Sequence, residues 1–203
     1  LYTGTGSELA VSGVGFQPDF TWTKSRSNEL NHNTYDAVRG ATKLLKPNLN
    51  VEEGTDAQSL KSFDSDGFTV GTDTHINTNG ATFVSWNWKA NGSGSSNTNG
   101  SINTTATSAN VDNGFSISTW TGNATSGASV GHGLSKAPEM IINKCRSSAG
   151  NWAVYHAGNT SAPETEYLEL ETNAATADIE NIWNDQAPTS SVFYLGNNAS
   201  VNG

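Results

Sequence analysis

The chain has 203 residues, which is enough for two domains of about 100 residues each. Its net charge of −9 and its lack of a Lys/Arg stripe argue against nucleic acid and against an anionic membrane surface as partners. No apolar run is long enough for a membrane-spanning helix, and a single cysteine excludes an internal disulfide framework.

Strands are predicted from runs of β-branched and aromatic residues that are bounded by Gly, Asn, Asp and Pro. In chain order, the predicted strands cover residues 20–24, 67–71, 81–88, 115–120, 139–144, 152–155, 167–170 and 192–195. Helix signals are weak, with one turn within 36–45 and a short helix over 176–183. This content predicts an all-β protein of the sandwich or jelly-roll type.

Two of these strands have informative side-chain patterns. Alternation places Phe20 and Trp22 on one face of the first strand. The third strand carries Phe83 on one face and Trp86 and Trp88 on the other. Large side chains on both faces predict that this third strand is buried on both sides.

The sequence repeats itself with a period of about 120 residues, which is too long for a solenoid and typical of a duplicated β domain. The offset between matching segments grows along the chain, as expected if loops lengthen between fixed strands. We therefore predict two tandem, homologous, antiparallel β-sandwich domains. Matching segments include Tyr2-Thr3-Gly4 with Trp120-Thr121-Gly122, Lys24-Ser25-Arg26-Ser27 with Lys144-Cys145-Arg146-Ser147, and Ile76-Asn77 with Val201-Asn202.

The repeat and the composition predict the domain boundaries. The first copy spans 1–91 and the second 111–203, and the Gly/Ser/Asn/Thr-rich residues 92–110 are predicted to be a flexible linker. The second copy lacks a counterpart of the last strand of the first copy, so we expect the sequence to be an excised or processed stretch of a longer protein. A missing strand leaves an open sheet edge, which another segment or a neighbouring subunit should cover.

A set of short segments covers most of the chain outside the predicted linker. The segments are Val14–Phe20, Asp36–Ala41, Ser62–Phe68, Gly131–Leu134 followed by Ala137-Pro138, and Trp152–His156. Together they resemble a repeated domain in virion structural proteins of marine tailed bacteriophages, of the concanavalin-A-like, lectin-resembling sandwich type. The resemblance implies a fibre, tail or capsid-surface component at the virion surface, outside the cell. It carries over no catalytic residue.

The segment Asp64-Ser65-Asp66-Gly67 presents two carboxylates and a glycine, as calcium loops do. An EF-hand loop also needs a Glu at its twelfth position, which here is His75. The favoured interpretation is a turn between strands, in which Asp side chains bond their own backbone. A calcium ion held by Asp64 and Asp66 is the alternative. The second copy has no carboxylates at the equivalent place, so no metal is predicted there.

No catalytic residue is predicted. The four histidines are far apart and show no metal-ligand spacing, and no Gly-x-Ser-x-Gly motif lies between a strand and a helix. The glutamates within 164–171 are interpreted as solvated strand charges rather than as glycosidase carboxylates. Arg26 and Arg146 occupy matching places, which favours a structural role such as pairing with a carboxylate, for example Asp36.

Aromatic residues beside Asn and Asp are the better lead to a ligand, because an aromatic face stacks on the C–H groups of sugars while amides bond the hydroxyls. The candidate glycan-binding residues are Trp22, Trp152 and Tyr155, although core burial is the alternative for most of the tryptophans.

These observations predict a virion structural protein that assembles with itself, as a trimer or polymer, and with other virion proteins. Fibre, tail and capsid-surface roles all stay open. The alternative is a carbohydrate-binding module that recognises host surface glycans. Nothing in the sequence positively supports an enzyme, and no cofactor is expected apart from the calcium alternative.

Overall fold

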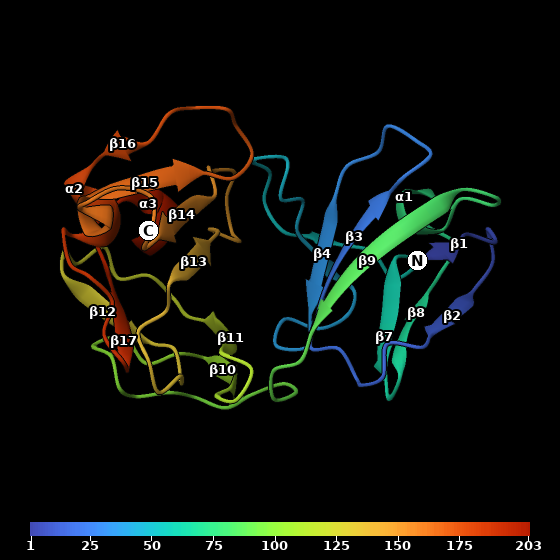
Figure 1. Cartoon of the computed structure of the whole chain (residues 1–203), viewed down its shortest axis with the longest axis horizontal. Coiled ribbons are helices and arrows are strands. Elements are labelled where there is room, and N and C mark those ends of the chain that lie inside the picture. Colours follow the sequence, from blue (N-terminus) through green and yellow to red (C-terminus); the bar gives the residue numbers. More distant parts are fainter. The chain divides into compact units, whose positions relative to one another are not determined.

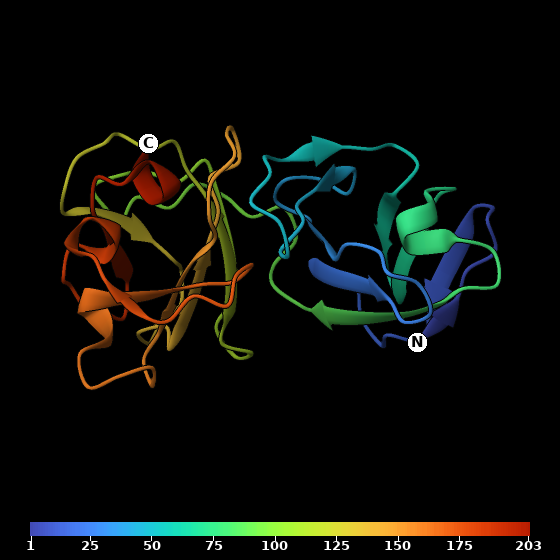
Figure 2. The same ribbon diagram turned by 90° about the horizontal axis from the view of Figure 1, so that it is seen from above.

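The computed structural model describes residues 1–203 and is all-β, with several antiparallel sheets and short helices, which is consistent with a β-sandwich. It divides into two compact units, shown in Figures 1 and 2. Unit 1 comprises residues 1–49 and 53–93, and unit 2 comprises residues 50–52 and 94–203.

Unit 1 contains a four-stranded sheet in the order β1-β9-β3-β4, a three-stranded sheet β2-β8-β7 and a small β5-β6 pair. All of its strand pairs are antiparallel. Its elements are β1 (Tyr2–Thr3), β2 (Leu9–Ser12), β3 (Phe20–Ser25), β4 (Asn33–Asp36), β5 (Lys43–Leu44), β6 (Gly54–Thr55), β7 (Leu60–Asp64), β8 (Gly67–Val70), α1 (Thr74–Asn77) and β9 (Thr82–Trp88).

The core of unit 1 lies where side chains from its two larger sheets meet. Tyr35 of β4 clusters with Leu60 and Phe68 of the other sheet, and all three are fully buried. Tyr2 joins the sheets, because its ring stacks on Phe83 at 5.1 Å and meets Phe68 edge-on at 6.0 Å. Such aromatic pairs stabilise the core beyond the free energy that comes from the apolar area each ring buries.

Unit 2 contains a four-stranded sheet in the order β13-β14-β15-β16 and two antiparallel pairs, β12-β17 and β10-β11. Its elements are β10 (Ala106–Asn110), β11 (Phe115–Thr119), β12 (Ala128–Gly131), β13 (Met140–Asn143), β14 (Ala153–His156), the 3-10 helix η1 (Pro163–Thr165), β15 (Glu166–Glu169), β16 (Ala177–Asp178), α2 (Glu180–Trp183), β17 (Val192–Leu195) and α3 (Ala199–Asn202).

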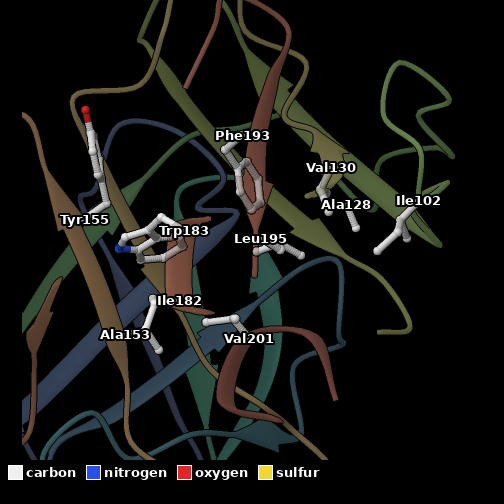
Figure 3. Close-up of a cluster of buried hydrophobic side chains, with 10 residues drawn as sticks. All are labelled: Ile102, Ala128, Val130, Ala153, Tyr155, Ile182, Trp183, Phe193, Leu195 and Val201. Carbon is white, nitrogen blue, oxygen red and sulfur yellow. The ribbon is translucent and has the colours of Figure 1, made fainter. Parts of the chain in front are cut away.

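Figure 3 shows the core of unit 2, in which side chains from strands and from the short helices pack together. Trp183 of α2 meets the ring of Tyr155 edge-on at 6.3 Å, and Trp120 packs in the same way against Phe193 at 5.6 Å. The buried cluster consists of Ile102, Ala128, Val130, Ala153, Tyr155, Ile182, Trp183, Phe193, Leu195 and Val201.

The predicted linker over 92–110 is wrong for residues 94–110, which fold as part of unit 2. Ile102 lies in the core and donates its N–H to the carbonyl of Ser129 at 3.0 Å. The small residues that suggested flexibility allow close backbone contact instead. A Cβ on Gly94 would lie 2.4 Å from the carbonyl oxygen of Thr107, and one on Gly100 would lie 2.3 Å from that of Ser129. Neither distance is sterically allowed, so glycine is required there.

The predicted strands all have an observed counterpart, with ends that differ by at most one residue. The predicted helix over 176–183 is correct only at its end, because Ala177–Asp178 pairs as β16 before α2 begins. The predicted turn within 36–45 is present, closed by a hydrogen bond of 3.0 Å from the N–H of Gly40 to the carbonyl of Asp36.

The two units use the same buried asparagine contact. In unit 1 the Asn77 amide accepts the N–H of Thr5 at 2.8 Å and donates to the carbonyls of Ser7 and Gly71, both at 2.6 Å. In unit 2 Asn202 makes the equivalent bonds. Its amide accepts from Asn123 at 2.9 Å and donates to Thr125 at 3.0 Å and Gly196 at 2.9 Å.

A lysine contact recurs in the same way at the ends of β3 and β13. Lys24 Nζ donates to the carbonyl of Ser25 at 2.6 Å and to that of Asn28 at 3.3 Å. Lys144 Nζ donates to the carbonyl of Cys145 at 2.6 Å and to that of Ser148 at 3.2 Å. The two lysines therefore close the same kind of turn and are not free surface charges.

The imidazole of His132, which follows β12, is buried with both ring nitrogens in hydrogen bonds. Nδ1 accepts the N–H of Leu134 at 3.1 Å, and Nε2 donates to the carbonyl of Thr189 at 3.1 Å. Burial lowers the pKa of His132 below its ordinary value, and the bond to Thr189 opposes this shift only in part. The neutral imidazole is therefore the form that fits unit 2.

We expect the stability of the protein to fall in mild acid because of His132. Its pKa is lower in the folded than in the unfolded state, so its contribution is complete above about pH 6.5 and declines as the pH falls below that value. Thermal unfolding followed between about pH 7 and pH 5 should show a falling Tm. The variant His132→Asn should have a shallower slope, and an unchanged slope would contradict the assignment. His32, whose pKa is also lowered, first by burial and then by Lys24, accounts for part of the slope that remains.

Candidate functional surfaces

The four-stranded sheet of unit 1 carries aromatic side chains on its outer face. In β3 the side chains of Thr21, Thr23 and Ser25 are buried, so the alternate residues Phe20 and Trp22 point outward. The hydroxyls are satisfied inside the unit, as when Thr21 Oγ1 donates to Asn87 Oδ1 at 3.0 Å. The usual arrangement of polar residues outside and aromatic residues inside is thus reversed on this strand.

Strand β9 extends the same outer face. Phe20 pairs with Trp88 and Trp22 pairs with Trp86, which places all four rings on one side of the sheet. Trp86 is 47% exposed and Trp88 is 38% exposed. We call Phe20, Trp22, Trp86 and Trp88 the aromatic face. The predicted burial of β9 on both faces is therefore wrong, because only the side that carries Phe83 is buried.

Contacts within unit 1 orient three rings of the aromatic face. The indole N–H of Trp22 donates to Nδ1 of His32 at 2.9 Å, and the two rings meet edge-on at 5.9 Å. Phe20 and Trp88 also meet edge-on, at 5.4 Å. His32 must be neutral to accept this hydrogen bond, and its pKa is lowered, first by burial and then by Lys24, so the imidazole beside Trp22 carries no charge at neutral pH.

The other two candidate glycan-binding residues lie inside unit 2. Trp152 is 6% exposed and Tyr155 is 5% exposed, and Tyr155 belongs to the core cluster. Neither ring face is available to a sugar, so the prediction is wrong for both residues. Of the three candidates, only Trp22 lies on an accessible surface, where Trp86 and Trp88 are the more exposed neighbours.

Asp64 and Asp66 lie at the turn between β7 and β8, and their oxygens are occupied by protein donors. Asp66 accepts the N–H of Gly15 at 2.6 Å and that of Gly13 at 3.0 Å, which lowers the pKa of its carboxyl. Asp64 accepts from the hydroxyls of Ser62 at 2.8 Å and Thr69 at 2.7 Å. The two side chains have separate roles, because Asp66 fixes a neighbouring loop and Asp64 holds its own hairpin.

The structure contains no group of three or more His, Cys, Asp or Glu side chains that could hold a metal ion. The hydrogen bonds of Asp64 and Asp66 are those that the turn interpretation predicts. The loop that Asp66 fixes forms one side of a shallow hollow of about 280 Å³ in unit 1, lined by Leu1, Val11, Ser12, Gly13, Val14, Phe16, Ser85 and Asn87. This volume is slightly below the usual range of about 300–1,000 Å³ for ligand pockets.

Ser59, Asp73 and His75 form a hydrogen-bonded chain, but not in the order that nucleophilic catalysis needs. Ser59 Oγ donates to Asp73 Oδ2 at 2.9 Å, and His75 Nδ1 contacts the other carboxylate oxygen at 3.1 Å. The serine therefore faces a carboxylate rather than an imidazole, and it is fully buried. Asp73 caps α1 through the N–H of His75 at 3.0 Å, which is a structural role.

The glutamates around β15 hold neighbouring strands. Glu169 accepts from the amide of Asn151 at 2.5 Å and from the hydroxyl of Tyr167 at 3.2 Å. Glu171 accepts the backbone N–H of Trp152 at 3.1 and 3.2 Å. Glu169 and Glu171 therefore accept hydrogen bonds from neighbouring residues of unit 2, and the interpretation of these two glutamates as solvated strand charges is wrong.

Strand β13 forms the second notable surface, at the edge of the four-stranded sheet of unit 2. It pairs with β14 on one side and has no strand on the other. Its side chains Met140 and Ile142 are 50% and 41% exposed. An unpaired strand with apolar side chains is a surface to which another strand can add.

Fold and surfaces together define an all-β protein of two units with an exposed aromatic face and an open sheet edge. The chain belongs to the family described as domain of unknown function DUF7483, whose model matches residues 1–203. No curated protein and no solved structure matches the chain. None of its helices has the length and apolar character needed to cross a membrane.

Proposed function

We propose that the chain is a structural component of a bacteriophage virion, a fibre, tail or capsid-surface protein, that assembles with itself and with other virion proteins. The aromatic face is the observation that carries this proposal, because a cluster of exposed apolar side chains marks a surface that another molecule covers. Tryptophan is also the residue type most enriched where interfaces gain their binding energy. The resemblance of Val14–Phe20 and Ser62–Phe68 to virion proteins supports the virion surface as the place of assembly.

We also infer that units 1 and 2 are homologous copies of one jelly-roll or lectin-like sandwich. The recurring contacts of Asn77 and Asn202, and of Lys24 and Lys144, support this inference, because each pair occupies matching places in the two halves of the sequence. Duplicated sandwich modules supply a stiff, repeated body, which suits a fibre or a coat.

Replacing Trp86 and Trp88 by threonine should weaken self-assembly. Threonine keeps the β propensity of β9 and removes only the exposed rings. The loss of one tryptophan that is central to an interface costs about 2 kcal/mol or more, which corresponds to roughly thirty-fold weaker association. Light scattering as a function of concentration measures the change.

The matched control is Val111→Thr with Ile179→Thr, because these side chains are 51% and 39% exposed and lie outside the aromatic face. The control should assemble like the unmodified chain. Equal assembly of all three proteins would mean that the aromatic face is not an interface.

A carbohydrate-binding module is the second candidate, favoured by the exposed ring faces of Trp86 and Trp88 beside the fixed ring of Trp22. Such rings stack on the C–H faces of neutral sugars. Glycan-array binding that is lost in the Trp86→Thr, Trp88→Thr protein, with its assembly unchanged, would favour this function over assembly. Absence of binding to every glycan would count against it.

A further inference from the structure

The tetrapeptide Asn-Thr-Asn-Gly occurs twice in the chain, once in each unit, at residues 77–80 and 97–100. Its last two residues form an Asn-Gly pair, which is the sequence at which a polypeptide most readily reacts with itself. The backbone nitrogen of the glycine can attack the side-chain carbonyl carbon of the asparagine, because glycine has no side chain to shield that nitrogen. Since the two tetrapeptides are identical, a difference between their reactivities in the folded chain comes from the structure.

Two kinds of contact decide how readily an Asn-Gly pair reacts in a folded protein. A hydrogen bond from the glycine N–H to a carbonyl holds the attacking nitrogen, and this bond must open before the nitrogen can lose its proton and attack. Burial and hydrogen bonds of the asparagine amide keep the carbon that is attacked away from that nitrogen. A reactive pair therefore combines an exposed, unbonded amide with an unbonded glycine N–H.

Asn99 and Gly100 meet both conditions. The side chain of Asn99 is exposed and makes no hydrogen bond within the chain, and the N–H of Gly100 has no acceptor there either. The backbone N–H of Asn99 donates to Oδ1 of Asn97 at 2.9 Å. The turn that carries the pair is thus held at Asn97, while both reacting groups stay free.

The matching pair in unit 1 meets only one of the conditions. The side chain of Asn79 is also exposed and without a hydrogen bond, but the N–H of Gly80 donates to the carbonyl of Gly4 at 2.9 Å. The attacking nitrogen is therefore engaged at Asn79 and free at Asn99. Asn202, which also precedes a glycine, is protected in the other way, because its amide donates to two carbonyls and the residue is 1% exposed.

We propose that Asn99 is a modification site at which the folded chain deamidates itself. The nitrogen of Gly100 forms a bond to Cγ of Asn99, and the side-chain nitrogen leaves as ammonia, taking the proton of the Gly100 nitrogen with it. The product is a cyclic succinimide. Water then opens the ring at one of its two carbonyls, which gives either aspartate or isoaspartate. Water is the only co-reactant, and no electrons are exchanged.

The modification falls next to a tight contact with β12. The N–H of Ser101 donates to Oγ of Ser129 at 3.0 Å, and the N–H of Ile102 donates to the carbonyl of Ser129 at 3.0 Å. A Cβ on Gly100 would lie 2.3 Å from that carbonyl oxygen, so the backbone has no room to shift there. Isoaspartate adds one carbon to the backbone and strains this contact, whereas aspartate only adds a negative charge to the exposed turn.

Peptide mass spectrometry of the folded full chain, kept at mildly alkaline pH, tests the proposal. Fragment spectra assign the amide-to-acid mass change to single residues. The product at Asn99 should accumulate at least about five-fold faster than at Asn79, because the hydrogen bond of Gly80 must open before the attack. The same chain in concentrated urea is the control. Both tetrapeptides are unfolded there, so the rates at Asn79 and Asn99 should become similar.

The variant Asn99→Gln identifies the reacting side chain. Glutamine would have to close a larger ring, which forms more slowly, and the exposed side chain has no partner whose loss could disturb the fold. Product at position 99 should disappear, while the rate at Asn79 stays unchanged. Equal rates at Asn79 and Asn99 in the folded chain, or an Asn99 that reacts only in urea, would overturn the proposal. Neither result depends on whether the chain assembles with itself.

Discussion

Replacing Arg39 with methionine is expected to destabilise unit 1 by about 3–5 kcal/mol. Arg39 Nε donates to Asp36, and Nη1 donates to Glu53 at 3.0 Å. The side chains of Arg39, Asp36 and Glu53 are 4%, 4% and 11% exposed. Methionine fills similar space but leaves two carboxylates in a buried position without a counter-charge. Breaking a buried pair in this way is costly, whereas the net value of the intact pair is small.

Urea unfolding, followed by tryptophan fluorescence, measures this effect. Lys61→Met is the matched control, because Lys61 pairs with Glu8 at the surface, where the two side chains are 37% and 63% exposed. An exposed pair contributes less than about 1 kcal/mol. If both substitutions lowered the free energy of unfolding by a similar small amount, the ion pairs of Arg39 with Asp36 and Glu53 would not stabilise the fold.

The second large loss of stability is expected when Asn77 or Asn202 is replaced by aspartate. Aspartate at either place keeps the acceptor oxygen but turns a donor of two hydrogen bonds into a charged oxygen that faces two carbonyls. Two lost bonds of about 1 kcal/mol each, together with the burial of an unpaired charge, predict a loss of at least about 3 kcal/mol per substitution.

Asn79→Asp and Asn113→Asp are the controls, since both side chains are exposed and the charge change is the same. Thermal unfolding of the four variants should show two large and two small shifts. If Asn77→Asp and Asn202→Asp differed strongly in their effect, the two contacts would not play equivalent roles and the proposed duplication would lose its main support.

Much of the fold follows from local sequence patterns. β3 and β17 are runs of β-branched and aromatic residues, whose preference for extended backbone acts locally, so they could be predicted. β1, β5 and β6 have two residues each and exist only through their partners. Strands of this kind depend on contacts that are distant in the chain, and no local pattern indicates them.

The candidate sites could be predicted less well, because the same residue types serve opposite purposes. Trp152 and Trp86 both lie in segments that were predicted as strands, yet Trp152 is buried and Trp86 is 47% exposed. The sequence did not indicate that β3 turns its threonines inward and its aromatic residues outward. Threonine can be buried there because its hydroxyl finds a hydrogen-bond partner within unit 1. Asp36, named as one example of a carboxylate for Arg26, is held instead by Arg39, which reaches it through a turn.

The central claim is that this protein acts by assembling with itself, and the molar mass of the purified full chain tests it most directly. Light scattering over a range of concentration, with cryo-microscopy of any particles, gives that mass and the arrangement of the copies. The account predicts a defined oligomer or a regular polymer whose copies meet at the aromatic face. A single species with the mass of one chain at every concentration would contradict it.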